Sequence, residues 1–323
     1  MSFDTLQEKI DKMQNPTVVG LDPALDSIPP EIMEKHIKAK GETLEAAAEA
    51  VLEFNIGLID ALHDIVPAVK PQSAFFEALG PAGVGTLKAT IDFAREKGLY
   101  VILDAKRNDI GSTAKGYSAA YLGAVKIGNT EIFPFNADAL TINAYLGSDG
   151  IEPFIETAKK YDKAMFALVK TSNPSAGEFQ DRLIDGKSLY TRVGELIEEI
   201  SSDTIGKYGY SRVGAVVGAT YPQELEFLRK HLKNTFFLVP GYGAQGGSVK
   251  SIASAFDKHG RGAIINSSRG IITAWKKAGV IKADINKATT GAAAFEVTET
   301  VAYEAARTEA LKMRDGLRKV LSF

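Results

Sequence analysis

Four charged side chains stand where the most hydrophobic segment of the chain ends. The stretch YVILDAKRNDI is first apolar and then carries Asp104, Lys106, Arg107 and Asp109 within six residues. Because side chains alternate along a strand, Asp104 and Lys106 are expected on the same side, about 6 to 7 Å apart along the backbone. Buried charges are costly unless they are fully paired or serve catalysis, so the segment is a candidate catalytic site.

Further charged residues are found at the ends of neighbouring predicted strands. Asp22 follows the first strand and Lys70 lies near the end of the second. An ordinary salt bridge at a strand end would explain a single Asp-x-Lys sequence, since such pairs are common and contribute little. A second lysine and a second aspartate at adjacent strand ends favour a catalytic interpretation over that structural one.

The elements that must position these residues alternate between short apolar runs and longer segments with helical periodicity. This pattern predicts parallel strands joined by helices, and eight such units favour a closed (β/α)8 TIM barrel over an open doubly wound sheet. In this barrel the active site lies at the carboxyl ends of the strands. The predicted strands are residues 17–22, 68–73, 100–106, 139–143, 164–170, 213–220, 236–242 and 262–268.

The chain is expected to form one domain. Its 323 residues and 45% hydrophobic content suit a single barrel with insertions, covering residues 1–323. The gap around 23–65 is longer than one crossover requires and is interpreted as an inserted helical segment. Residues 295–321 predict one further amphipathic helix at the C-terminus. The long, turn-rich segment after the fifth strand is either a lid over substrate or an ordinary surface loop.

Composition argues against several classes of function. With 38 basic and 40 acidic side chains, the formal charge of −2 provides no basic surface for nucleic acid or an anionic membrane. The absence of cysteine excludes thiolate nucleophiles and Cys-ligated metals, and four scattered histidines offer no metal spacing. The start, MSFDTLQEKIDKMQ, is polar and has no apolar core like that of a signal peptide, and no apolar run reaches the length of a membrane span, so a cytoplasmic protein is expected.

A glycine-rich segment after the seventh strand predicts a phosphate site. In VPGYGAQGGS, residues 239–248, the spacing of Gly241, Gly243 and Gly246 formally matches a dinucleotide fingerprint. That fingerprint requires an acidic residue about 20 positions later, whereas the next strand is followed by Arg269. Backbone N–H groups, the Gln245 amide and the Arg269 guanidinium instead suit a single phosphate group, although tight loops that need positive φ would also explain the glycines.

Taken together, these segments resemble orotidine 5'-phosphate decarboxylase. DAKRNDI is similar to the Asp-x-Lys-x-x-Asp-Ile signature of that family, and VVGLDP, AVKPQ, LVKTSNPSA, PGYGAQGG and INSSRGI follow in the order of the family. The similarity extends from residue 17 to 270 and is greatest to the longer bacterial branch. The short branch has a histidine where this chain has Asn173.

The resemblance implies decarboxylation of orotidine 5'-monophosphate to UMP, the last step of de novo pyrimidine nucleotide synthesis, without metal or organic cofactor. Lys106 would stabilise the carbanion at ring carbon 6 and protonate it. Asp104 would lie near the departing carboxylate and hold Lys106. Lys70 would complete the charge network and contact the ribose.

The resemblance also assigns the remaining substrate contacts and a homodimer. Asp22 would accept a ribose hydroxyl and Ser172 would hydrogen-bond the pyrimidine. The phosphate would be bound by the segment with Gln245 and Gly246 and by Arg269. Asp109 and Thr113 would reach into the active site of the neighbouring subunit.

Three alternatives remain open from the sequence. Magnesium-dependent decarboxylases and aldolases of keto-sugar phosphates share the Asp-x-Lys-x-x-Asp motif, but they have a metal-binding glutamate where this chain has Lys70, and a cation there would repel Mg²⁺. A Schiff-base aldolase would use Lys170 or Lys106. A barrel that binds a phosphate ligand without catalysis is the alternative from another class.

Overall fold

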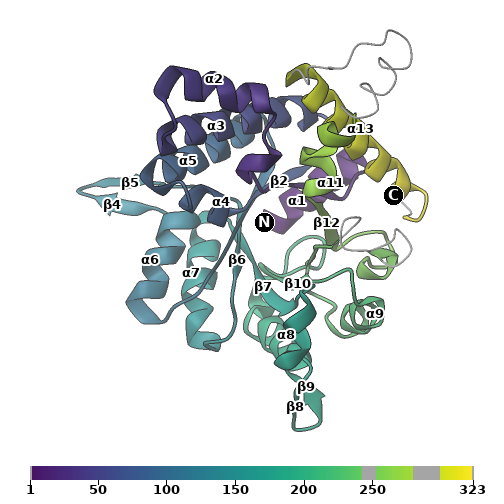
Figure 1. Cartoon of the computed structure of the whole chain (residues 1–323). Coiled ribbons are helices and arrows are strands. Elements are labelled where there is room, and N and C mark those ends of the chain that lie inside the picture. The colour runs from purple at the N-terminus through teal and green to yellow at the C-terminus, as the bar shows by residue number, and fades with distance from the viewer. Residues whose placement is uncertain (1, 242–251, 279–298, 322–323) are drawn as a thin grey trace.

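A closed barrel of eight parallel strands forms the centre of the molecule (Figure 1). The computed structural model describes residues 2–241, 252–278 and 299–321. All eight predicted strands are present, and each boundary lies within three residues of the predicted one. The TIM barrel expected from the sequence is therefore confirmed. In spatial order the strands are β1 (Thr17–Leu21), β12 (Ala263–Ser267), β11 (Phe237–Val239), β10 (Val213–Val217), β7 (Ala164–Lys170), β6 (Ala139–Ile142), β3 (Tyr100–Arg107) and β2 (Ala68–Pro71).

Helices surround the barrel, as expected for parallel strands that need a crossover connection. Short 3₁₀ turns punctuate the loops between them. The helices are α1 (Ser2–Met13), α2 (Pro30–Lys40), α3 (Leu44–Leu62), α4 (Ser73–Glu77), α5 (Gly80–Glu96), α6 (Gly111–Tyr121), α7 (Glu152–Tyr161), α8 (Leu189–Ile200), α9 (Pro222–His231), α11 (Arg269–Ile272) and α13 (Glu299–Arg318). The 3₁₀ turns are η1 (Leu25–Ser27), η2 (Ser148–Gly150), η3 (Pro174–Glu178), η4 (Ser202–Thr204) and η5 (Ala253–Ala255).

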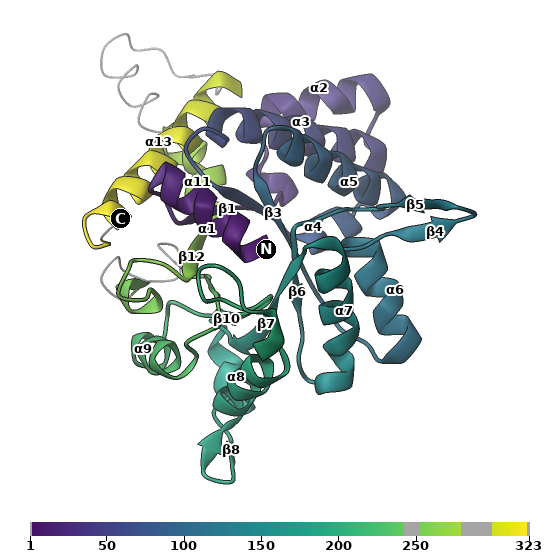
Figure 2. The ribbon, with the colours of Figure 1, turned by 180° about the vertical axis from the view of Figure 1, so that it is seen from behind.

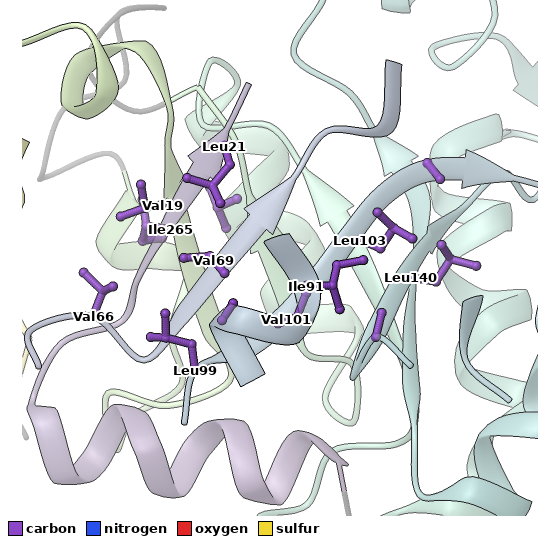
Figure 3. Packing of buried hydrophobic residues seen from close by; sticks show 14 of the residues in the cluster. Val19, Leu21, Val66, Val69, Ile91, Leu99, Val101, Leu103, Leu140 and Ile265 are labelled. Atoms are coloured by element: carbon purple, nitrogen blue, oxygen red, sulfur yellow. The ribbon is translucent and has the colours of Figure 1, made fainter. Parts of the chain in front are cut away.

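Alternation along the strands divides the hydrophobic core into two layers. On β3, Val101 and Leu103 belong to the layer between barrel and helices, where Ile91 of α5 also packs (Figure 3). Ile102, between them, belongs to the second layer inside the barrel. Successive strand residues point to opposite faces, so one apolar run supplies both layers.

Helix α1 packs across the N-terminal end of the barrel, where Figure 2 shows it near the viewer. Its buried Phe3 lies with its ring centroid 4.9 Å from that of Phe166 on β7 and 5.0 Å from that of Phe236, which precedes β11. The interior is thereby filled with apolar side chains from this end. Polar chemistry is left to the opposite, carboxyl ends of the strands.

The segment around 23–65 holds η1, α2 and α3. Thr43 caps α3, its hydroxyl accepting a hydrogen bond from the backbone N–H of Ala46 at 3.1 Å. Helix α13 packs against α3, where Gly57 leaves room for the ring of Tyr303; a Cβ at Gly57 would lie 2.0 Å from that ring. The start of the predicted 295–321 helix falls outside the described residues, and the assignment of 1–323 to a single domain stays a prediction.

Two hairpins were not expected from the sequence. One consists of β4 (Val125–Ile127) and β5 (Thr130–Ile132) and projects from the body of the molecule (Figure 1). The other, β8 (Leu183–Ile184) with β9 (Lys187–Ser188), lies in the turn-rich segment after β7. Both have strands too short for the periodicity of their sequences to distinguish them from loops. No described helix has the length and apolar character needed to span a bilayer.

Candidate active site

Alternating charges lie at the carboxyl ends of β1, β2 and β3. Lys70 Nζ is 2.7 Å from Asp104 Oδ2 and 3.9 Å from Asp22 Oδ1. Lys106 Nζ is 2.6 Å from Asp104 Oδ1. The order Asp22, Lys70, Asp104, Lys106 places each charge beside one of opposite sign. The structure thus brings together the four charged residues that the sequence predicted from separate strand ends.

The carboxylate of Asp104 accepts hydrogen bonds from four side chains. Besides the two lysines, Gln72 Nε2 donates to Oδ2 at 3.0 Å and the Thr141 hydroxyl donates to Oδ1 at 2.8 Å. Burial alone would raise the pKa of Asp104, but Lys70 and Lys106 outweigh burial, and the pKa of this carboxyl lies well below its usual range. Asp104 therefore stays ionised at neutral pH.

Lys70 is the buried cation of this network and Lys106 the accessible one. Burial alone would lower the pKa of Lys70, but the carboxylates of Asp104 and Asp22 raise it above its ordinary value. Lys70 is therefore charged despite its burial. The Lys106 side chain is 46% exposed and borders the cavity described below. Lys106 is thus the more accessible of the two cations that line the cavity.

The backbone of β3 departs from regular strand geometry at this point. Lys106 has φ of +50°, in the left-handed region that residues with a Cβ rarely adopt. The pairing of β3 with β6 shifts between Leu103 and Arg107, which marks a bulge. We predicted that Asp104 and Lys106 lie on the same side because side chains alternate along a strand. The two side chains do meet, but this reason was wrong, because the strand is not regular here. The two side chains meet because the chain bulges between them.

A cavity of about 410 Å³ opens over the network. Its floor includes Lys70, Asp104 and Lys106, and its other wall carries Ser172 and Gln180. Apolar side chains complete it. This combination of an apolar lining with a few convergent polar groups is typical of small-molecule sites. The full lining is Lys70, Asp104, Lys106, Thr141, Leu168, Thr171, Ser172, Asn173, Gln180, Val216, Leu238 and Pro240.

Gln180 is a cavity residue that the sequence analysis missed. The backbone N–H of Thr171 donates to Gln180 Oε1 at 2.9 Å, and Gln180 Nε2 donates to the Thr171 hydroxyl at 2.7 Å. These bonds fold the turn-rich segment after β7 back over the cavity. Thr141 and Gln72 were missed as well. Gln72 stands next to a predicted strand end, the position from which the other candidates were chosen, whereas Thr141 lies in the middle of the predicted strand 139–143.

Lys170, considered above for a Schiff base, is fully buried at the end of β7. Its ammonium pairs with Asp181 and lies 5.3 Å from the ring centroid of Tyr190 and 4.6 Å from that of Tyr221. The Lys170 ammonium is therefore already engaged by one carboxylate and two aromatic rings of the protein. It is poorly placed to attack a carbonyl group in the cavity.

Asp109 and Thr113 lie outside the cavity of their own chain. Within the described residues, the one hydrogen bond to the Asp109 carboxylate comes from the neighbouring Ile110 N–H, at 2.8 Å. Thr113 is exposed in the first turn of α6. Neither residue contributes to the charge network within one chain.

The predicted phosphate residues are described only in part. Gln245 and Gly246 lie outside the described residues. Arg269 is exposed at the start of α11 and lines a second cavity, of about 560 Å³, between α11 and α13. Because β12 pairs with β1, with Ser267 opposite Val19, Arg269 lies on the same rim of the barrel as Asp22.

In the parts of the chain that the structure describes, no group of three or more His, Asp or Glu side chains could hold a metal ion. At the mouth of the barrel, the position beside Asp22 and Asp104 is taken by the ammonium of Lys70.

Comparison with known proteins identifies the family. A family model described as orotidine 5'-phosphate decarboxylase / HUMPS family matches residues 21–283. The chain belongs to this family. It is 45% identical over 278 residues to the orotidine 5'-phosphate decarboxylase of Rhodopirellula baltica, covering 86% of this chain and 90% of the relative. To that of Clostridium perfringens (strain SM101) it is 37% identical over 322 residues, 99% of each chain.

A solved structure supports the same assignment. Leishmania donovani OMP decarboxylase matches with a TM-score of 0.67 and 28% identity, over 98% of both chains. As a member of the orotidine 5'-phosphate decarboxylase family, the chain is an enzyme of the decarboxylase class. The family indicated by the sequence motifs is confirmed. The roles of individual residues stay predictions.

Proposed function

We propose that the chain converts orotidine 5'-monophosphate to UMP and carbon dioxide, with Lys106 as the catalytic cation and acid. The observation that carries the proposal is the contact of 2.6 Å between Lys106 and an ionised, four-fold hydrogen-bonded Asp104 at a cavity of about 410 Å³. Relatives named orotidine 5'-phosphate decarboxylase that match over 84% to 99% of the chain support the choice of substrate.

The proposed reaction breaks the bond between ring carbon 6 and its carboxylate. Carbon dioxide leaves, and the electron pair of that bond stays on carbon 6. The Lys106 ammonium stabilises this developing charge and delivers a proton to it, and solvent then reprotonates the lysine. Asp104 holds the ammonium and faces the departing carboxylate, which its own negative charge repels until that group has left.

The rest of the substrate extends along the rim. Lys70 and Asp22 are assigned to the ribose hydroxyls and Ser172 to the pyrimidine. Gln245, Gly246 and Arg269 are assigned to the phosphate, the group farthest from the bond that breaks. In this proposal the product, UMP, is the end point of de novo pyrimidine nucleotide synthesis.

The primary test is an absorbance assay with orotidine 5'-monophosphate, because the pyrimidine spectrum changes when the carboxylate is lost. We expect turnover without added cofactor and undiminished activity after exhaustive chelation with EDTA. Loss of activity on chelation and recovery with Mg²⁺ would instead favour a keto-sugar phosphate chemistry. Binding of the nucleotide without turnover would identify the barrel as a binding protein.

We further propose that a second copy of the chain completes the site, through Asp109 and Thr113. Asn108 Nδ2 donates to the Gly150 carbonyl at 3.2 Å, so the segment after β3 lies beside the loop after β6. Large apolar side chains are exposed on both: Ile110 is 53% exposed and Tyr145 81%. Such a patch next to two polar residues without a role in their own chain suits a subunit interface.

Mixed dimers test the shared site. Lys106→Ala and Asp109→Ala should each be nearly inactive as homodimers. After subunit exchange between equal amounts, half the dimers are mixed and each holds one intact site, so about a quarter of all sites should work. If exchange is verified by a mass-tagged subunit and no activity returns, Asp109 acts within its own chain.

A further inference from the structure

A buried threonine on β6 lies opposite the bulge in β3. Leu103 pairs with Leu140 and Arg107 pairs with Ile142, so the three residues 104–106 face Thr141 alone. Thr141 is 2% exposed. In a regular strand pair, three residues of β6 would face residues 104–106. Here Thr141 alone lies opposite their backbone hydrogen-bonding groups.

The side chain of Thr141 bridges the two residues proposed for catalysis. The backbone N–H of Lys106 donates to Thr141 Oγ1 at 3.0 Å, and Thr141 Oγ1 lies 2.8 Å from Asp104 Oδ1. An N–H group cannot accept and an ionised carboxylate cannot donate. The Thr141 hydroxyl therefore accepts a hydrogen bond from the Lys106 N–H and donates its own proton to Asp104, so the direction of both bonds is determined.

These two bonds stabilise a conformation that the lysine would otherwise avoid. A φ of +50° is unfavourable for a residue with a Cβ, and such conformations persist only where the surroundings hold them. A partly buried N–H at a bulge, where the regular strand pairing is interrupted, also needs an acceptor. The Thr141 hydroxyl supplies this acceptor and, through the same atom, orients the carboxylate oxygen that contacts Lys106 Nζ.

We propose that Thr141 is a positioning residue for the reaction. Its hydroxyl holds the Lys106 backbone in the bulge, and it orients the Asp104 carboxylate toward the Lys106 ammonium. This inference rests on the proposed function, since Lys106 and Asp104 are the groups positioned. Valine at residue 141 has nearly the same shape as threonine but cannot make either bond, so the hydroxyl can be tested apart from packing.

The test compares Thr141→Val with Thr141→Ser in steady-state assays with orotidine 5'-monophosphate. Because a misplacement of about 1 Å can cost about 100-fold in rate, we expect the valine variant to lose about 10- to 100-fold in kcat. Its KM and its affinity for UMP should change by less than about threefold, because phosphate and ribose contacts are intact. Thr141→Ser keeps the hydroxyl and should recover most of kcat.

Thr86→Val is the matched control. Thr86 is also buried, on α5, and its hydroxyl donates to the Ala48 carbonyl at 3.0 Å, away from the cavity. Its loss should lower the melting temperature and leave kcat unchanged. If Thr141→Val is too unstable to assay, Thr141→Ala removes the hydroxyl without adding a methyl group and is expected to show the same split between kcat and KM.

A crystal structure of Thr141→Val provides a second readout, independent of turnover. We expect Lys106 to leave the positive-φ region and its Nζ to move away from Asp104. A variant with an unchanged Lys106 backbone and a kcat within about twofold of wild type would overturn the inference. If wild-type protein fails to decarboxylate the substrate, the proposed function fails, and the positioning role is then decided by whether Lys106 moves in this structure.

Discussion

The two ends of the barrel each hold an aspartate between two cations, but the surroundings give the clusters different properties. At the carboxyl ends of the strands, Asp104 lies between Lys70 and Lys106. At the N-terminal ends, Asp138, just before β6, pairs with Arg95, and Lys163, just before β7, is 3.8 Å from the same carboxylate. Both clusters border a cavity: the first lines one of about 410 Å³ and the second one of about 380 Å³. Helix α1 lies beside the second cavity, and its Ser2 hydroxyl donates to the Asp138 carbonyl at 3.1 Å.

The difference lies in the charges around each lysine. Burial lowers the pKa of Lys163 to about 8, because the positive charge of Arg95 adds to the effect of burial and the carboxylates of Asp138 and Asp162 do not outweigh the two. The pKa of Lys70 is raised, because Asp104 and Asp22 together outweigh burial. Asp138 also accepts the Val101 N–H at 2.9 Å, which ties the start of β3 to that of β6. The first cluster therefore keeps its buried lysine charged, and the second connects the starts of two strands.

The largest expected effect separates the two clusters by activity. Lys106→Ala should lower kcat by at least about 1,000-fold, because the variant lacks both the electrostatic stabilisation and the proton donor. Affinity for UMP should be largely retained, because the ammonium acts on charge that develops only in the transition state. Lys163→Met, the control from the other end, should keep full kcat in the same assay. A Lys106→Ala enzyme with a tenth of wild-type activity would contradict the assignment of the acid.

A smaller effect is expected from the two arginines. Arg269→Ala should raise KM by about 10- to 100-fold, the range expected for one lost charge-assisted contact to phosphate. Wild type and variant should process a substrate without phosphate equally well, which distinguishes phosphate binding from any other role. Arg95→Ala removes a partner of Asp138 and should lower the melting temperature while leaving KM unchanged. Severe impairment of Arg269→Ala on the truncated substrate would assign that arginine another task.

The smallest effect concerns stability against pH. The folded state holds the Lys163 pKa near 8, below the unfolded value, so the unfolded chain binds more protons between about pH 8 and 10.5. The penalty for burying the charged lysine is complete below pH 8 and is relieved as pH rises through this window. Compared with Lys163→Met, wild type should therefore gain unfolding free energy from pH 8 to 10, measured by denaturant titration. A difference that is constant across this range would show that Lys163 keeps an ordinary pKa.

Much of the fold could be predicted from local sequence. The eight strands were located because β-branched and apolar runs alternate with helical periodicity, and both signals depend on neighbouring residues alone. The hairpin of β4 and β5 could not be found in this way. Its cross-strand pairs, such as Val125 with Ile132, are all exposed, so no buried face imposes a pattern on the sequence.

The charged members of the site were predictable for a similar reason. Charges at the ends of apolar strands are conspicuous in sequence, and parallel strands in a barrel bring their carboxyl ends to one rim. This reasoning was sufficient for Asp22, Lys70, Asp104 and Lys106. It also placed Ser172 at the rim, where the structure finds it in the wall of the cavity.

Only the tertiary structure decided how these groups are held. Asp104 and Lys106 were expected to meet through strand alternation, whereas they meet across a bulge whose backbone is satisfied by Thr141, 35 residues from Lys106 along the chain. Gln72 joins the site through a bond of the same non-local kind, to Asp104 32 residues away, whereas Gln180 joins it through the fold of its own loop. The sequence by itself determines which residues carry charge and which segments are strands, because both are local properties. Barrel closure determines which hydroxyl or amide meets each charge, because it sets the register between strands that are distant in sequence.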